Sequence, residues 1–382
     1  MSDNAVYITD IASHLPNSPV DNDSMEKILG QVGERPSRAR RTVLRSNGIK
    51  TRYYGIDPKT GSHNYTNTSL TAAAVGKLNR SISLDDIDCL SCGTSIADQL
   101  MPNHAAMVQG ELQLSRCEAV ASAGVCASGI AALKYAYMSV LCGQHDNAVA
   151  TGSELASAIM KADNFSAEID SAVESLKKKP EIAFEKDFLR WMLSDGAGAA
   201  LLQAKPNNNS LSLRIDWLEI ISYAGEIEPC MYAGAEKNSS GNLIGWQQFN
   251  AEQRNQQSIF AIKQDVKLLN ENIIHYTVEQ PLQEIVKRRQ LKAEQFDWFL
   301  PHYSSAFFRD KLLAGLDSAG LAIEQSRWFT NLTEKGNTGA ASIYIMLDEL
   351  FHSGKLQPGQ KLLCYVPESG RFSTSFMQLT VV

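Results

Sequence analysis

The sequence ASAGVCASG at residues 121–129 places one cysteine, Cys126, among small residues directly before an apolar run. That run, residues 130–141, carries a single charged side chain, and a helix that is apolar nearly all round belongs in the interior of a large protein. The first turn of such a helix presents unpaired N–H groups and the positive end of the helix dipole to Cys126. This setting favours a thiolate, the nucleophilic form of cysteine. The alternative is that Cys126 is only a small buried apolar residue, as free cysteines usually are.

The composition is that of an ordinary globular protein, with 382 residues, 44% hydrophobic residues, 20% charged residues and a net charge of -6. This length can form two units with their own cores or one large composite domain. The mild acidity argues against nucleic acid as the main partner. No apolar run reaches the length of a membrane span, and the first residues do not resemble a signal peptide.

The seven cysteines are odd in number and scattered along the chain, which predicts reduced thiols and a cytoplasmic protein. Cys89 and Cys92 form a C-x-x-C pair inside an apolar strand-like run, with no second pair at zinc spacing. We therefore interpret both as core residues and predict neither a metal nor a cofactor.

Strand-like and helix-like segments alternate along the chain, which predicts an α/β protein. The expected strands are 5–9, 87–94, 146–154, 211–222, 297–302 and 361–366, and the expected helices are 69–78, 105–114, 130–141, 252–290 and 305–319. Residues 161–190 are amphipathic and charged, so we interpret them as an added surface segment, and residues 225–245 as a polar loop. The best linker is KPNNNS at 205–210. It divides the chain into an N-terminal half, 1–205, and a C-terminal half, 206–382.

The two predicted halves share an internal similarity. Cys126 begins a helix-like run that ends at Gly143, and Asn337 begins one that ends at Gly354, seventeen residues later in both cases. A short turn and a strand follow each run, and these strands end in TGSE at 151–154 and PESG at 367–370. The pattern predicts a duplicated fold whose two central helices pair, so that Cys126 and Asn337 can meet at one site.

The chain resembles the beta-ketoacyl-acyl-carrier-protein synthase III branch of the thiolase superfamily. The motifs that carry this resemblance are AGVCASG at 123–129, DGAGA at 195–199, Pro301-His302, GNTGAAS at 336–342 and, near the N-terminus, GIKTR at 48–52. These motifs span nearly the whole chain and follow one another in the same order as in the family. The resemblance implies a duplicated five-layer αβαβα fold, a homodimer, and a Cys-His-Asn site at the bottom of a pantetheine tunnel.

The resemblance also implies a role for each residue of the site. Cys126 would attack an acyl thioester and hold the acyl group covalently, while the N–H groups of Cys126 and Gly370 would form the oxyanion hole. His302 and Asn337 would donate hydrogen bonds to the carbonyl oxygen of a second, malonyl or beta-ketoacyl thioester, whose carbanion attacks the acyl group. Taken singly, His302 could be a hydrogen-bonded core histidine and Asn337 a helix cap. Their joint match to the family favours catalysis.

Departures from the family narrow the expected function. The triple-glycine loop is replaced by SGRF at 369–372, and Arg45 lies in TVLRSN at 42–47, without the aromatic residue that grips coenzyme A in housekeeping members. Phe307 replaces an arginine used in carrier docking, for which Arg309 is a stand-in, and Met101 matches a position that reaches across the dimer into the acyl pocket. These residues, Met101, Arg45, Phe307 and Arg309, are the predicted substrate contacts. The arginines of segment 35–52 could bind the phosphate of a phosphopantetheine carrier or a nucleotide-bearing thioester. The alternative is that they form only a solvated charged face.

We therefore predict a specialised ketosynthase of lipid, polyketide or other secondary metabolism that uses acyl-carrier-protein or coenzyme A thioesters. The ketosynthases of dialkylresorcinol pathways are the suspected subgroup. One alternative is an acyltransferase of the same fold with an oxygen or nitrogen acceptor. Another is a cysteine-dependent thioester hydrolase, because GVCASG at 124–129 is a near miss to the nucleophile elbow. A non-catalytic subunit is a third, which the complete Cys-His-Asn set argues against.

Overall fold

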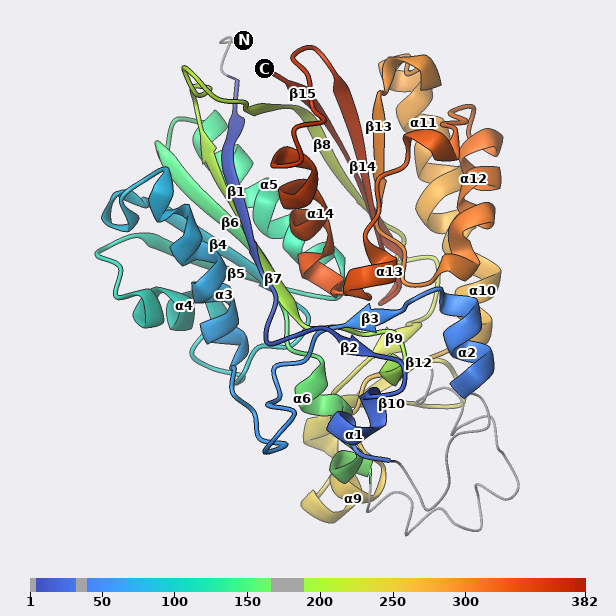
Figure 1. Ribbon diagram of the computed structural model, residues 1–382. Coiled ribbons are helices and arrows are strands. Elements are labelled where there is room, and N and C mark those ends of the chain that lie inside the picture. The colour runs from blue at the N-terminus through green and yellow to red at the C-terminus, as the bar shows by residue number, and fades with distance from the viewer. Residues whose placement is uncertain (1–4, 32–39, 166–188) are drawn as a thin grey trace.

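A nine-stranded mixed sheet forms the centre of the protein, with the strand order β13-β14-β15-β8-β1-β7-β6-β4-β5. The computed structural model describes residues 5–31, 40–165 and 189–382 (Figure 1). Most of the predicted surface segment 161–190 lies outside the described residues. The sheet strands are β1 (Tyr7–His14), β4 (Cys89–Thr94), β5 (Glu118–Ala123), β6 (Asn147–Glu154), β7 (Gly196–Gln203), β8 (Leu213–Ser222), β13 (Trp298–Pro301), β14 (Lys361–Glu368) and β15 (Ser373–Val381).

The two sides of this sheet mirror each other about the pair β1 and β8. From the centre outward, one side runs β1, β7, β6, β4 and the other β8, β15, β14, β13. Beyond β4 lies the parallel strand β5, and beyond β13 a parallel bridge joins Phe299 to Trp328. The mirrored order is that of a duplicated fold. It supports a division near residue 205, in the loop between β7 and β8, although that boundary stays a prediction.

The layers follow the αβαβα order expected for the thiolase fold (Figure 1). Helices α3 (Asn67–Gly76) and α4 (His104–Leu112) cover the outer face of the N-terminal strands. Helices α5 (Ala127–Leu141) and α14 (Ser342–Phe351) form the middle layer between the two sides. Helices α10 (Val266–Ile274), α11 (Gln280–Arg289) and α12 (Arg309–Ser318) cover the C-terminal strands. None of the described helices is long and apolar enough to cross a membrane.

The remaining elements are short. They are the helices α1 (Met25–Leu29), α2 (Arg40–Asn47), α6 (Ser157–Met160), α9 (Ala251–Gln256) and α13 (Leu332–Lys335), and the strands β2 (Val20–Asp21), β3 (Thr51–Arg52), β9 (Met231–Tyr232), β10 (Ala235–Lys237), β11 (Leu243–Gly245) and β12 (Lys263–Gln264). A π-helical turn, His275–Glu279, joins α10 to α11.

The predicted continuous helix 252–290 is wrong, because residues 257–265 leave the helical path. Asn250 caps the short helix α9 through a capping box with Gln253, and Asp265 caps α10 by accepting the N–H of Leu268. Between these two caps, β12 pairs with β9. The predicted polar loop 225–245 therefore also contains strand structure, which forms part of the wall of a large cavity described below.

The turn before α14, Gly339–Ala341, packs in direct backbone contact with α5 and β6. A Cβ atom added to Gly129 would lie 2.2 Å from the carbonyl oxygen of Ala340, and one added to Gly152 would lie 2.1 Å from the same atom. The hydroxyl of Tyr344 donates a hydrogen bond of 2.8 Å to the carbonyl oxygen of Gly129. These contacts confirm the predicted pairing of the two helices and explain their small residues.

Replacing Gly129 by alanine is therefore expected to destabilise the protein. The new methyl group would overlap a backbone oxygen that cannot rotate away, and overpacking of this kind costs about 1–3 kcal/mol. The measurement is the free energy of unfolding in urea. Gly110→Ala on α4 is the matched control, because nothing lies within 4 Å of its added Cβ, so it should be neutral or stabilising. Equal stability of both variants would contradict the expectation.

Candidate active site

Cys126 lies where two cavities meet. It follows β5 and a Gly124-Val125 turn, and it is the N-cap residue of α5. The Ser128 hydroxyl donates 2.7 Å to the carbonyl oxygen of Val125 and fixes this turn. A cavity of about 50 Å³ and one of about 740 Å³ both have Cys126, Ser304 and Ser369 in their walls. The thiol is therefore accessible from two directions.

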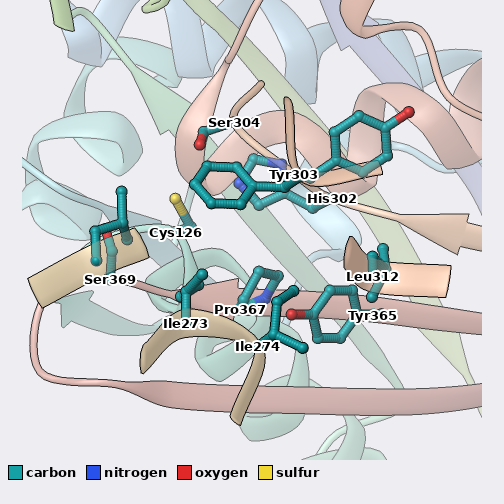
Figure 2. A pocket seen from close by; sticks show the side chains of 12 residues that line it. Cys126, Ile273, Ile274, His302, Tyr303, Ser304, Leu312, Tyr365, Pro367 and Ser369 are labelled. Atoms are coloured by element: carbon teal, nitrogen blue, oxygen red, sulfur yellow. The ribbon is translucent and has the colours of Figure 1, made fainter. Parts of the chain in front are cut away.

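His302 lines the smaller of these cavities together with Cys126 (Figure 2). It directly follows β13, and its N–H donates 2.8 Å to the carbonyl oxygen of Tyr365 on β14. The side chain is buried, and burial lowers the pKa of His302 to about 4. Among the described residues no side-chain or backbone group hydrogen-bonds to the ring. The ring is therefore neutral at ordinary pH and free to bind a ligand, unlike a hydrogen-bonded core histidine.

Asn337 lines the larger cavity, again together with Cys126. Its N–H donates to the carbonyl oxygen of Met192, and its own carbonyl oxygen accepts from the N–H of Ser194. The side-chain oxygen accepts the N–H of Gly339 at 3.0 Å, so the residue caps the turn before α14. Because the oxygen is used in the cap, the amide NH₂ is left as a donor. Asn337 can therefore serve both predicted roles at once, because its side-chain oxygen caps the turn while its NH₂ group donates to a ligand.

The structure thus places Cys126 in one cavity wall with His302 and in a second cavity wall with Asn337. Gly370 lies nearby in the hairpin between β14 and β15, where a Cβ atom added to it would lie 3.0 Å from a side-chain methyl of Val125. Its carbonyl oxygen accepts the N–H groups of Cys230 and Met231. Within the described parts of the chain, the N–H groups of Cys126 and Gly370 donate to no other residue, and the Cys126 N–H faces its own thiol. Both are therefore available as donors of an oxyanion hole.

Two glutamates that the sequence analysis did not single out flank Cys126. Burial, followed by the charges of Glu154 and Glu368, raises the pKa of the Cys126 thiol above its usual range. This direction is opposite to the expectation that the helix N-terminus favours a thiolate, because burial and the two carboxylates outweigh the helix N-terminus.

The larger cavity is apolar over most of its wall and has the size of a site for an extended ligand. Its apolar lining comes from segments far apart in the sequence, and includes Ile96, Leu100, Ile159, Trp246, Phe260 and Ile262. Trp246 and Phe260 also contact each other, with ring centroids 5.9 Å apart. The cavity could hold an acyl chain whose reactive end lies at Cys126.

The four predicted substrate contacts lie outside these two cavities. Met101 is 84% exposed beside the cavity-lining Leu100, itself 77% exposed. Arg45 is an exposed residue of α2, a helix that packs near the turn holding Phe307. The guanidinium of Arg309 lies 5.9 Å from the ring of Trp328. All four therefore remain predictions, and their exposed or peripheral positions fit contacts in a dimer or a carrier complex.

The arginine-rich segment is partly structural. Arg52 is fully buried and donates to the carbonyl oxygen of Trp191 and the side-chain oxygen of Asn22. Arg40 forms ion pairs with Asp23 and Glu26. These two arginines hold the fold together, so only part of the segment is left for a carrier.

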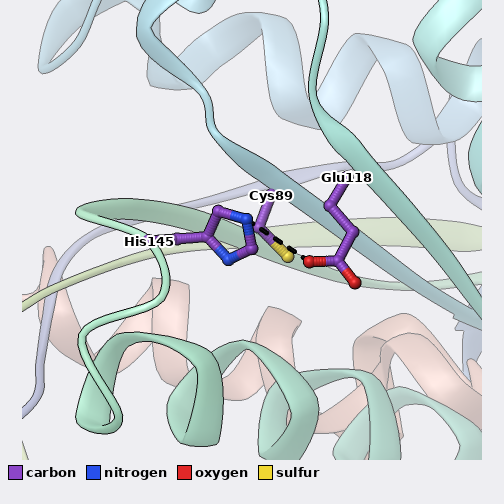
Figure 3. A group of neighbouring side chains, drawn as sticks. All are labelled: Cys89, Glu118 and His145. Carbon is purple, nitrogen blue, oxygen red and sulfur yellow. Dashed lines mark ion pairs between the residues drawn. The ribbon is translucent and has the colours of Figure 1, made fainter.

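A separate cluster, Cys89, Glu118 and His145, lies at the other end of α5 (Figure 3). The three donor types suit zinc, but each already has a partner. His145 is 3.3 Å from Glu118 and also contacts the Ser139 hydroxyl, and Tyr135 donates to Glu118. Burial raises the pKa of Cys89 to about 12. We interpret the cluster as a clamp between β4, β5 and the loop after α5, with Cys89 as the predicted core residue.

Comparison with known proteins places the chain in a family. Residues 52–208 match the N-terminal domain of beta-ketoacyl synthases, and residues 286–371 match the C-terminal domain of 3-oxoacyl-[acyl-carrier-protein] synthase III. The chain belongs to the beta-ketoacyl-ACP synthase III-like condensing enzymes. It is 24% identical to the beta-ketoacyl-ACP synthase III of Ruegeria sp. over 92% of this chain and 91% of the relative. It is 26% identical to that of Lactococcus lactis over 91% and 90%.

Solved structures of condensing enzymes share the fold. AbyA1, a tetronic acid condensing enzyme, superposes with a TM-score of 0.75 at 19% identity, covering 98% of this chain and 99% of that one. OleA from Xanthomonas campestris, solved with lauric acid and lauroyl-CoA, has a TM-score of 0.72 at 18% identity over the full length of both chains. The synthase III of Pseudomonas aeruginosa has a TM-score of 0.70 at 18% identity, covering 98% of each.

A neutral His302 should be visible in its titration. Because burial lowers its pKa to about 4, the ring should stay neutral as the pH falls from 7 to 5 and should charge only below that. The measurement is the NMR titration of the histidine ring protons, with His302→Gln used to assign the signal. Exposed His275 is the internal reference. A midpoint for His302 near the ordinary value of about 6.5 would contradict this expectation.

Proposed function

We propose that this condensing enzyme joins two thioesters through a covalent acyl group on Cys126. The observation that carries the proposal is the convergence of Cys126, His302 and Asn337 on the meeting point of two cavities. A nucleophile, a neutral imidazole and an amide donor are the groups that acyl transfer followed by carbon–carbon bond formation requires.

In the first step the Cys126 sulfur attacks the acyl carbonyl carbon, and the thiol of the donor leaves. The N–H groups of Cys126 and Gly370 would hold the developing oxyanion, because neither donates to another residue among those that the structure describes. The acyl chain would extend into the larger, apolar cavity. In the second step His302 and Asn337 would donate hydrogen bonds to the carbonyl oxygen of the second thioester, which carries negative charge as its carbanion forms.

The donors we propose are acyl-carrier-protein or coenzyme A thioesters, in a specialised lipid or polyketide pathway. The size and apolar lining of the cavity support an acyl chain longer than acetyl. The exposed pair Leu100 and Met101, next to that cavity, supports a homodimer in which the loop contacts the partner subunit. The SGRF sequence at 369–372 departs from the triple-glycine loop of the family pattern, which supports a specialised substrate.

Intact-mass analysis of the purified protein incubated with acyl thioesters of increasing chain length tests the first step. We expect a stoichiometric adduct that peptide mapping assigns to Cys126. Addition of a second thioester should then discharge the adduct as a carbon–carbon product. Free acid alone would indicate a hydrolase, and an ester or amide product would indicate an acyltransferase. Absence of an adduct at every chain length would remove the proposal.

A further inference from the structure

Glu154, the last residue of β6, presents one carboxylate oxygen to the reaction cavity. Its Oε1 atom accepts three hydrogen bonds, from the hydroxyl of Ser95 at 2.5 Å, the N–H of Ser95 at 3.3 Å and the N–H of Ala340 at 3.0 Å. These bonds fix the side chain. Glu154 lines the larger cavity together with Cys126 and Asn337, and among the described residues its Oε2 atom has no hydrogen-bond partner. That oxygen is therefore held in place and free to meet a substrate.

The surroundings of Glu154 favour proton transfer near neutral pH. Burial raises the pKa of Glu154 to about 7, against the opposing effect of its hydrogen bonds, and the nearby carboxylate of Asp195 adds to the rise. The other titratable groups that face the cavity are Asp98, Cys126 and Tyr232. A carboxylate whose pKa lies near the working pH is suited to act as a general base.

Glu368 places a second carboxylate next to Cys126. Its Oε2 atom accepts the N–H groups of Val125 at 3.2 Å and Ala127 at 3.3 Å, the two residues that flank the nucleophile. Within the described residues no lysine or arginine forms an ion pair with it. A negatively charged group brought to Cys126 would therefore approach an acidic side chain that no cation neutralises.

We propose that Glu154 is a catalytic base that removes the α-proton of an uncharged second thioester, and that Glu368 disfavours a malonyl group at the same site. This inference rests on the proposed function and names the class of its second substrate. An acyl or beta-ketoacyl thioester has no carboxylate to lose as carbon dioxide, so its carbanion can form only by loss of a proton. Glu154 and Glu368 fit that chemistry.

The step balances without a further reactant. The α-carbon gives its proton to Glu154, and the electron pair of that C–H bond forms the new bond to the carbonyl carbon of the acyl group on Cys126. The bond between that carbon and the sulfur breaks, and the sulfur leaves as a thiolate. Glu154 then returns the proton to the sulfur, which restores both groups for the next cycle.

Glu154→Gln tests the base directly, because the amide oxygen of glutamine can accept the same three hydrogen bonds. In deuterated buffer the wild-type protein should exchange the α-proton of an uncharged thioester. We expect Glu154→Gln to lower both this exchange and condensation by about 10²- to 10⁴-fold, while Cys126 acylation changes by only a few-fold. Condensation by the wild type should rise with pH through about 7. Unchanged exchange in the variant would overturn the role of Glu154.

Glu368→Gln tests the selection against malonyl. The variant removes the repulsion between the Glu368 carboxylate and the malonyl carboxylate. We expect the ratio of the condensation rate with a malonyl thioester to the rate with an uncharged thioester to rise by about tenfold or more. The pH profile of Cys126 alkylation should also shift to lower pH in this variant. The reason is that the Glu368 carboxylate, which raises the pKa of the Cys126 thiol, has been removed. Exposed Glu226→Gln is the control. Two results would overturn the proposed role of Glu368. One is a wild-type protein that prefers a malonyl thioester, and the other is a Glu368→Gln variant with the same malonyl-to-uncharged rate ratio as the wild type.

The proposed function and this inference can fail separately. Proton exchange is observed on the second thioester alone, so it can be present even where no carbon–carbon product forms. Exchange that depends on Glu154 without condensation would support the base and count against the proposed function. Condensation without exchange, and with malonyl only, would support the proposed function and overturn the inference.

Discussion

Replacing Cys126 by serine is expected to abolish the covalent acyl adduct and to lower condensation by about 10⁴-fold or more, a loss typical of a removed nucleophile. The serine hydroxyl has nearly the same size, so the α5 N-terminus and both cavities should persist. The adduct is measured by intact mass, and condensation by product formation. Residual activity should come from positioning of the two thioesters alone.

A thiol at the surface provides the control for this experiment. Cys142 lies in the turn after α5 and is exposed, so alkylating reagents reach it without entering a cavity. Cys142→Ser should acylate and condense like the wild type. If Cys126→Ser still carried a stoichiometric acyl group, or if Cys142→Ser lost it, the assignment of the nucleophile would be wrong.

Replacing Asn337 by aspartate is expected to lower condensation by about 10²- to 10³-fold while leaving Cys126 acylation largely intact. Aspartate can still accept the N–H of Gly339, the bond that caps the turn before α14, so the fold is preserved. It loses the NH₂ donor and places a negative charge next to the developing enolate. Loss of one such donor typically costs a factor of 10²–10³ in rate.

The two steps must be measured separately for Asn337→Asp. Single-turnover acylation is followed by intact mass, and discharge of the purified acyl-enzyme by the second thioester is followed by product formation. Asn208→Asp, in the exposed loop between β7 and β8, controls for the added charge. An equal loss in both steps would show that Asn337 acts mainly through the structure of its turn.

The sequence predicted the fold, and it predicted that three residues far apart in the chain lie near one another, which the walls of the two cavities show. Their signals are local. The small residues after Cys126 and Asn337 allow the close backbone contact between the start of α5 and the turn before α14, and small residues at these two positions are the pattern that recurs in both halves. His302 follows a buried strand, which fixes its place at the edge of the sheet. The resemblance to a family then assigned these three residues to one predicted catalytic site.

The two glutamates were missed because an acidic residue at the end of a strand usually faces solvent. The internal similarity held a usable signal, since TGSE at 151–154 and PESG at 367–370 end the strands that follow the two central helices. The cavity walls could not be predicted, because residues such as Ile273 and Trp246 reach Cys126 only through the tertiary fold. Periodicity shows which face of a helix is buried, but not what it contacts.

The close packing of Gly129 and Gly152 against Ala340 also restricts movement at the site. The carbonyl oxygen of Ala340, in the turn before α14, is held against a glycine of α5 and a glycine of β6. The segment that carries Asn337 therefore cannot shift along the start of α5 without breaking this contact. The spacing between the thiol of Cys126 and the amide of Asn337 is set by the backbone, so both substrates must fit one fixed geometry.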